Sequence, residues 1–113
     1  MRREGRGDGP AITGFKGGRI VIDGTERPGG VVLTPTSAHD WDGEDLLSAL
    51  GDATPELMLY GSGSALVRPA AALVRTLEAR GIGLEVMDTR AAARAWCVLR
   101  AEGREVVAAL RAL

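Results

Sequence analysis

The segment of residues 56–87 constrains the fold of this chain more than any other part of the sequence. Residues 56–60 form a compact apolar run that is too short for a helix, which predicts a buried strand. Apolar residues then recur at helical spacing from Pro69, which opens the helix, to Gly81, and residues 82–87 form a second short apolar run. Strand, helix and strand in this order predict a βαβ unit whose two strands pair in parallel with a right-handed crossover.

The first third of the chain is punctuated by glycine and predicts short strands. Residues 12–15 and 19–22 flank the pair Gly17-Gly18, which favours a hairpin. Residues 31–33 predict a third strand, which a following proline stops. This part of the chain is therefore expected to be rich in β-structure.

Two further helices are indicated by capping residues and spacing. A short helix is expected between Asp42, as its N-cap, and Gly51. A longer one is expected between Thr89, as its N-cap, and the region of Gly103. The pattern of residues 105–113 fits either a helix or a strand. These elements indicate an α/β protein of mixed α+β character, with β-sheets and about three helices.

The length of 113 residues fits a single domain with one core. Residues 1–11 are rich in glycine and charged side chains, and they hold too few apolar residues to offset the entropy lost on ordering. They predict a disordered tail ahead of a domain that spans residues 12–113.

Charge and composition exclude several classes of protein. The chain has 14 Lys and Arg against 15 Asp and Glu, a net charge of -1, whereas nucleic-acid binders are usually basic. No run reaches the roughly 20 apolar residues that cross a bilayer, and the start lacks a signal peptide. Cys97 is the one cysteine and His39 the one histidine, so neither an internal disulfide nor a Cys/His zinc set forms within one chain. We expect a cytoplasmic protein with no nucleic acid and no membrane insertion.

Acidic residues gather around Trp41, in a stretch that also contains His39, which is expected in a loop. The acidic residues that follow Trp41 are explained by helix capping and the helix dipole, and the spacing of a calcium-binding loop is missing. The sequence therefore indicates no metal site and no cofactor.

The sequence Gly61-Ser62-Gly63-Ser64 directly follows the first strand of the βαβ unit. In open α/β sheets this position is where ligands bind and where free N–H groups meet anions. The phosphate-binding pattern with a third glycine fails because Leu66 stands at that place, and the nucleophile elbow of hydrolases is absent. The loop is either a tight turn or a site for a small anion.

Parallel pairing of the two βαβ strands would place loop 61–64 beside loop 87–90 and form a crevice. On the helix that follows, Arg90, Arg94 and Cys97 recur at a spacing that places them on one face. Cys97 is either mildly activated by the two cations or inert and half-buried. No catalytic set is indicated, and the hypothetical ligand-binding residues are Gly61, Ser62, Gly63, Ser64, Arg68, Thr89, Arg90, Arg94 and Cys97.

Three segments together resemble the Mth938-like family, formerly a domain of unknown function. They are the first strand pair with Trp41, the stretch Leu59–Gly63, and residues 89–110; the resemblance covers residues 12–111. The most specific positions are Thr89, Ala92, Trp96, Val98, Leu99, Glu102, Gly103, Arg104, Val107, Ala108, Ala109 and Leu110. Cys97 replaces the usual Asn, whose paired donor and acceptor a thiol lacks, and Ser62 stands where Thr is common.

The resemblance implies a compact α/β domain in which helices pack on β-sheets and the last segment is a strand. It implies no established enzyme activity, and relatives of the family include an assembly factor of mitochondrial complex I. The leading hypothesis is a non-enzymatic protein-interaction or assembly module, with a protein partner or a homodimer. The alternative is a small-molecule or anion-binding protein, possibly an enzyme, that uses the crevice between loops 61–64 and 87–90.

Overall fold

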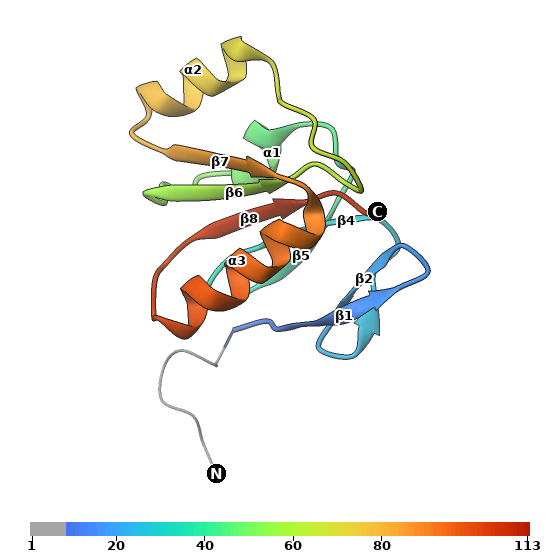
Figure 1. The fold of residues 1–113 in the computed structure, drawn as a ribbon. Coiled ribbons are helices and arrows are strands. Elements are labelled where there is room, and N and C mark those ends of the chain that lie inside the picture. Colours follow the sequence, from blue (N-terminus) through green and yellow to red (C-terminus); the bar gives the residue numbers. More distant parts are fainter. Residues whose placement is uncertain (1–8) are drawn as a thin grey trace.

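The computed structural model describes residues 9–113 (Figure 1). The elements are β1 (Ile12–Lys16), β2 (Arg19–Ile22), β3 (Thr25–Glu26), β4 (Gly30–Leu33), β5 (Ala38–Trp41), α1 (Leu46–Leu50), β6 (Leu57–Gly61), α2 (Ala71–Ala79), β7 (Gly83–Met87), α3 (Thr89–Ala101) and β8 (Val107–Leu110). The expected single domain of mixed α and β structure with three helices is confirmed.

The strands form two sheets. The larger sheet has the order β5-β4-β8-β6-β7, and the smaller one has the order β1-β2-β3. Strand β6 pairs in parallel with β7 and with β8, while β4 runs antiparallel to its neighbours β5 and β8. The predicted parallel pair of the βαβ unit is thus present as β6-α2-β7, with Leu57 opposite Gly83 and Gly61 opposite Met87.

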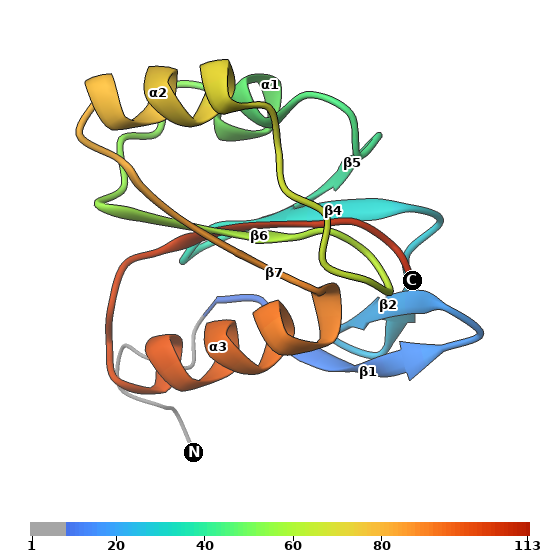
Figure 2. The same cartoon turned by 45° about the horizontal axis from the view of Figure 1, so that its top comes forward.

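Helices and a hairpin cover the two faces of the larger sheet (Figure 2). Helices α1 and α2 lie on one face, whereas α3 and the β1–β2 hairpin lie on the other. Alternation along β6 divides its side chains between the faces, since Leu59 packs with Trp96 of α3 and Met58 packs with Leu77 of α2. Trp96 is almost fully buried. The core therefore consists of two apolar clusters separated by the sheet.

Strand β8 lies at the centre of the larger sheet, and its four residues Val107–Leu110 are all buried. This confirms the strand that the family resemblance implies, and it resolves the choice that the local pattern left open. A central strand has no solvent-facing side, so its side chains need not alternate between apolar and polar.

The helix starts differ from the predictions because neighbouring side chains act as caps. Asp45, and not Asp42, caps α1, since its carboxylate accepts a hydrogen bond from the Leu47 amide at 3.0 Å. Asp88, and not Thr89, caps α3 by accepting from the Ala91 amide at 2.9 Å. In both cases the acceptor lies two or three residues before the amide it binds.

Helix α2 begins later than predicted. Its N-cap is Ala70 and its first residue is Ala71, so Pro69 precedes the helix and does not open it. Ala70 provides no side-chain cap, and its backbone carbonyl accepts from the amides of Leu73 and Val74.

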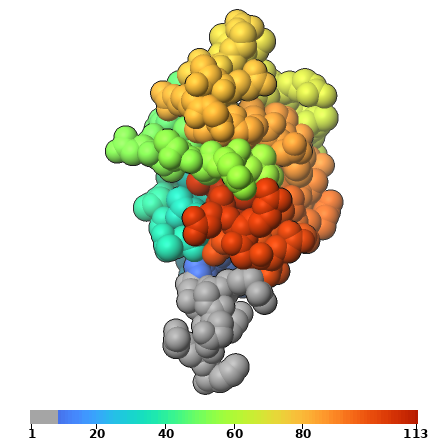
Figure 3. Space-filling model, turned by 90° about the vertical axis from the view of Figure 1, so that its left-hand side faces the viewer, coloured from blue at the N-terminus to red at the C-terminus, as the bar shows by residue number. Residues whose placement is uncertain are grey.

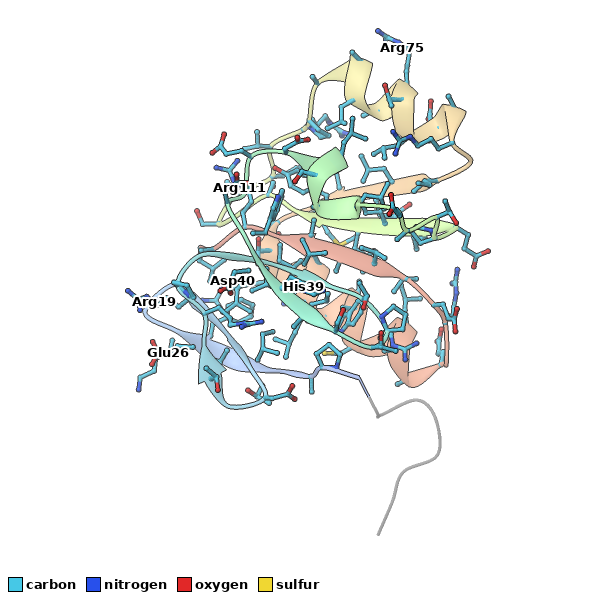
Figure 4. All side chains as sticks on the ribbon, turned by 180° about the vertical axis from the view of Figure 1, so that it is seen from behind. Arg19, Glu26, His39, Asp40, Arg75 and Arg111 are labelled. Atoms are coloured by element: carbon cyan, nitrogen blue, oxygen red, sulfur yellow. The ribbon has the colours of Figure 1, made fainter. Side chains whose placement is uncertain are left out.

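Two strands were not predicted. The pair Thr25–Glu26 adds β3 to the hairpin, and Ala38–Trp41 forms β5, so the placement of His39 in a loop is wrong. Figure 4 shows His39 and Asp40 on β5. The sequence of β5 has few apolar residues because it is an edge strand, with His39 and Asp40 exposed. The structure of β5 is decided by its antiparallel pairing with β4, in which Gly30 lies opposite Trp41 and Leu33 lies opposite Ala38.

Most of the tail expected at residues 1–11 falls on residues 1–8, which lie outside the described residues. Ala11 is held by two hydrogen bonds, since its amide donates to the carboxylate of Asp23 at 3.1 Å and its carbonyl accepts from the Asp23 amide at 2.9 Å. Within residues 9–113 no helix combines the length and apolar character needed to span a membrane.

Candidate functional site

Hydrogen bonds join the loop after β6 to the start of α3. The amide of Ser62 donates to the carbonyl of Met87 at 2.9 Å, and the amide of Thr89 donates to the carbonyl of Gly63 at 2.8 Å. The amide of Gly63 donates to the hydroxyl of Thr89 at 2.9 Å, and that hydroxyl donates to the carbonyl of Arg111 at 2.7 Å. Thr89 is fully buried. Two amides that an anion would need at this loop are thus already bonded within the protein.

Gly61 lies in close contact with α3 and β8. A Cβ atom at this position would stand 2.9 Å from the Cα and Oγ1 of Thr89 and 2.9 Å from Cδ2 of Leu110. The loops 61–64 and 87–90 are therefore adjacent, as predicted, and their facing backbones are packed together. We call this contact, made by Gly61, Gly63, Thr89 and Arg111, the Thr89 joint.

Ser62 shapes the loop that leads to α2. Its buried hydroxyl donates to the carbonyl of Ala65 at 2.6 Å and accepts from the amide of Val67 at 2.9 Å. The loop consequently exposes Leu66, Val67 and Arg68, with Leu66 54% and Val67 55% accessible. Ser64 is also exposed. Arg68 lines neither of the two grooves that flank α3 and are described below.

Arg90, Arg94 and Cys97 do share one face of α3, as the spacing predicted. That face borders a groove of about 470 Å³ between α3 and β1, which we call the β1 groove. Its lining residues are Ile12, Thr13, Gly14, Phe15, Arg90, Ala93, Arg94, Cys97 and Val98. The guanidinium carbon of Arg90 lies 4.9 Å from the centre of the Phe15 ring, a cation–π contact.

A second groove, of about 380 Å³, runs along the other side of α3 and is called here the β7 groove. Its lining residues are Leu57, Leu59, Glu85, Met87, Arg94, Ala95, Val98 and Leu99. Arg94 and Val98 border both grooves, and Val98 is 56% accessible. The outer side of α3 is therefore an exposed face, basic and partly apolar, with a groove on each flank.

The thiol of Cys97 is exposed and unpaired. Although the residue is exposed, partial burial raises the pKa of Cys97, because desolvation disfavours the thiolate. A thiol activated by Arg90 and Arg94 would instead have a lowered pKa, so the raised pKa argues against that hypothesis. At neutral pH the side chain is an uncharged thiol.

We expect Cys97 to react with a thiol reagent more slowly than a model thiol at pH 8, because less of it is ionised. As the pH is raised, the labelling rate of Cys97 should still increase at pH values where the rate of a model thiol has levelled off, because the model thiol is then fully ionised. Time-resolved labelling with a maleimide, followed by mass spectrometry over a range of pH, measures this directly. Labelling of urea-unfolded protein serves as the control, and a folded thiol that reacts faster than the unfolded one contradicts the prediction.

A third cavity, of about 540 Å³, lies at the opposite end of the sheet and was not predicted. Its lining residues are Thr34, Pro35, Ala53, Thr54, Pro55, Glu56, Glu105, Val106 and Val107. Figure 3 looks onto this end, where the teal, green and red parts of the chain adjoin. Three loops that are distant in sequence form it, so no local pattern reveals it. Glu56 is exposed here and contacts Arg104, with 3.5 Å between Oε1 and Nη2.

Metal-binding chemistry finds no support in the described part of the chain. Residues 9–113 contain no group of three or more His, Cys, Asp and Glu side chains that could hold a metal ion.

The fold and its grooves define a small α+β domain with an exposed, groove-flanked helix. The chain belongs to the family described as a protein of unknown function (DUF498/DUF598), whose model matches residues 12–111. An uncharacterised protein of Rhodobacter capsulatus is 38% identical over 101 residues, which cover 88% of this chain and 82% of that protein.

Solved structures show the same fold. The solution structure of a Bordetella pertussis protein, described as a Mth938-like domain, has a TM-score of 0.82 and 26% identity, covering 99% of this chain and 91% of that one. A crystal structure of a Bartonella henselae protein, described as an outer membrane protein, has a TM-score of 0.82 and 27% identity. The match covers 93% of this chain and 97% of that one. The resemblance to the Mth938-like family is confirmed.

Proposed function

We propose that this chain is a non-enzymatic protein-interaction or assembly module, and that a partner protein docks an amphipathic helix in the β7 groove. The supporting observation is that α3 covers β7 only in part on one of its two faces. Leu84 and Val86 of β7 pack into the cluster beneath α1 and α2, whereas Glu85 and Met87 point to the α3 side and line the open groove.

The dimensions of sheets and helices explain why this face is incomplete. Strands lie about 4.8 Å apart, and a helix with its side chains is about 10 Å wide, so one helix covers about two strands. Helix α3 packs mainly on β6 and β8, and the β1–β2 hairpin covers the β4 side of the same face. A helix placed beside α3 would complete the layer over β7.

The groove specifies the chemistry of that helix. Leu57, Met87 and Val98 offer apolar contacts, which favour apolar residues at helical spacing. Glu85 is exposed and forms no ion pair within residues 9–113, so a basic side chain on the partner helix is its natural counterpart. A second copy paired through the β7 edges would bring two Glu85 side chains together, which disfavours a homodimer at this edge.

We place this role in the cytoplasm by inference, because the unpaired Cys97 suits a reducing compartment. The location named in the description of the Bartonella protein is a statement about that protein. Separation of the producing cells into cytoplasm and membranes, with immunodetection of the chain, tests this placement.

Site-specific photo-crosslinking tests the proposed docking. Incorporation of p-benzoylphenylalanine at Glu85 should yield a discrete adduct in the cells that produce this protein, whose crosslinked peptide has apolar residues at helical spacing and a basic residue. The matched control is incorporation at Arg75, which is exposed on α2 and points away from the sheet (Figure 4). The same adducts from both positions, or a peptide without helical spacing, would overturn the proposal.

Val98→Asp should weaken the binding of the captured partner by roughly tenfold, because it places a charge in the centre of the apolar contact. Val98 is exposed, so the fold should tolerate this change. Titration of the identified partner peptide against both proteins by calorimetry gives the ratio of the two Kd values. Equal Kd values would place the partner elsewhere on the surface.

A further inference from the structure

We propose that the β1 groove is a separate binding site for a single-chain anionic amphiphile, whose carboxylate pairs with Arg90 and Arg94 while its apolar chain lies against Phe15 and Ala93. The site is formed where the N-terminal strand β1 lies beside α3 (Figure 2). It requires no partner protein, and it shares only Arg94 and Val98 with the β7 groove.

The charges of the groove favour an anion. Arg90 and Arg94 both line it, and none of its lining residues is acidic. Neither arginine takes part in an ion pair in the described part of the chain, where the ion pairs are Lys16–Glu26, Arg27–Asp40 and Arg104–Glu56. Glu85 lines the other groove together with Arg94 and forms no ion pair with it. Two arginines thus line the β1 groove, and no acidic residue lines it with them.

The contact between Arg90 and Phe15 fixes one of these charges. At 4.9 Å from the ring centre, the guanidinium is held over an apolar surface, where its charge is less hydrated than in open solvent. Guanidinium groups bind carboxylates through paired hydrogen bonds, which are stronger than those between neutral groups. The polar end of a ligand is therefore expected at this end of the groove.

The remaining lining is mostly apolar, and the hydroxyl of Thr13 is bonded to the backbone of Val21 and Gly24. Ile12, Phe15, Ala93 and Val98 form most of it, and the Cys97 thiol adds no negative charge because burial raises its pKa. A Cβ built on Gly14 would meet no atom within 4 Å, so the space beside this strand is open. The groove has a volume of about 470 Å³ and is open to solvent. An inorganic anion would leave this apolar surface hydrated, whereas an alkyl chain would cover it.

The test is a titration of the 113-residue chain, labelled with ¹⁵N, with decanoate below its micelle concentration and at low ionic strength. Decanoate should shift the amide signals of residues 12–15 and 90–98 in a saturable manner. It should bind roughly fourfold or more tightly than octanoate, because each buried methylene adds free energy of transfer. Decyltrimethylammonium, which has the same chain and the opposite charge, should bind at least about fivefold more weakly.

Variants then locate the charge. Arg94→Gln should weaken decanoate binding by about three- to tenfold, and Arg94→Lys should restore part of the affinity because it keeps the charge but not the paired hydrogen bonds. Arg75→Gln on α2 is the matched control and should change nothing. Arg94 and Arg75 are both exposed, and the amide spectrum itself reports whether each variant is folded.

Three outcomes would overturn the proposal. Equal binding of decanoate and decyltrimethylammonium would show that the arginines do not select the ligand. Equal binding of octanoate and decanoate would show that the apolar lining is not covered. Shifts confined to residues outside 12–15 and 90–98 would place the ligand at a different surface.

Discussion

Replacement of Thr89 by valine is expected to lower the free energy of unfolding by about 2–4 kcal/mol. Valine keeps the shape of threonine but removes the hydroxyl that accepts from the Gly63 amide and donates to the Arg111 carbonyl. The buried Gly63 amide and the part-buried Arg111 carbonyl would each lose a partner, and the loss of a partner by a buried group costs about 1–3 kcal/mol. The midpoint of thermal unfolding, followed by circular dichroism, should fall by about 10 °C or more.

Thr76→Val is the matched control for this variant. Thr76 lies exposed on α2, where its hydroxyl donates to the carbonyl of Ala72 at 3.0 Å, so its loss should change stability by about 0.5 kcal/mol or less. If the two valine variants unfold with the same free energy, the Thr89 joint does not stabilise the fold.

The second large effect is expected for Gly61→Ala, which should destabilise the protein by about 1–3 kcal/mol. The added methyl group would stand 2.9 Å from the backbone Cα of Thr89, which cannot move without displacing the start of α3. It would also stand 2.9 Å from the hydroxyl oxygen of Thr89, so the same joint is disturbed from its other side. Urea unfolding at equilibrium measures this difference.

Gly29→Ala tests whether space, and not backbone freedom, explains the effect at Gly61. A Cβ on Gly29 would meet its nearest atom, the carbonyl oxygen of Trp41, at 3.8 Å, which is an ordinary contact. This variant should retain the stability of the natural sequence within about 0.5 kcal/mol. Equal losses from both alanines would show that the close contact at Gly61 is not the cause.

The Thr89 joint is expected to affect both proposed binding sites, because it holds the start of α3. The same helix provides Val98 to both grooves, and its first turn follows Thr89 directly. Loosening of the joint should therefore weaken binding in either groove indirectly, whereas Val98→Asp and Arg94→Gln act on the contacts themselves. Stability measured alongside affinity separates these two causes.

Local sequence patterns predicted those elements that are marked by a turn signal or by a regular spacing of apolar residues. The β1–β2 hairpin follows from the Gly17-Gly18 turn, and the β6-α2-β7 unit follows from two apolar runs around a helical spacing. Strand β5 was missed because an edge strand with exposed His39 and Asp40 has no alternating pattern, and its structure depends on the backbone of β4. The helix starts were misplaced because several adjacent side chains are chemically able to cap.

The candidate sites were predicted in part. Helical periodicity placed Arg90, Arg94 and Cys97 on one face of α3, and the structure agrees. Periodicity cannot show what lies opposite that face, since the second wall of each groove comes from β1 or β7. The neighbourhood of loops 61–64 and 87–90 also followed from the parallel strands, but the hydrogen bonds that fill the Thr89 joint depend on the carbonyl of Arg111 from the far end of the chain.

The sequence alone determined the single domain, the βαβ unit and the basic, partly apolar face of α3, because turn chemistry and the repeat of a helix act between residues close in the chain. Only the tertiary structure decided that β8 lies at the centre of the larger sheet, that loop 61–64 packs against Thr89, and that α3 has a groove on each side. These features arise from contacts between segments distant in sequence, whose burial and hydrogen bonding are fixed by how the layers pack. The GSGS motif thus forms part of a joint that holds α3, and the groove-lining residues of α3 gain their second walls from β1 and β7.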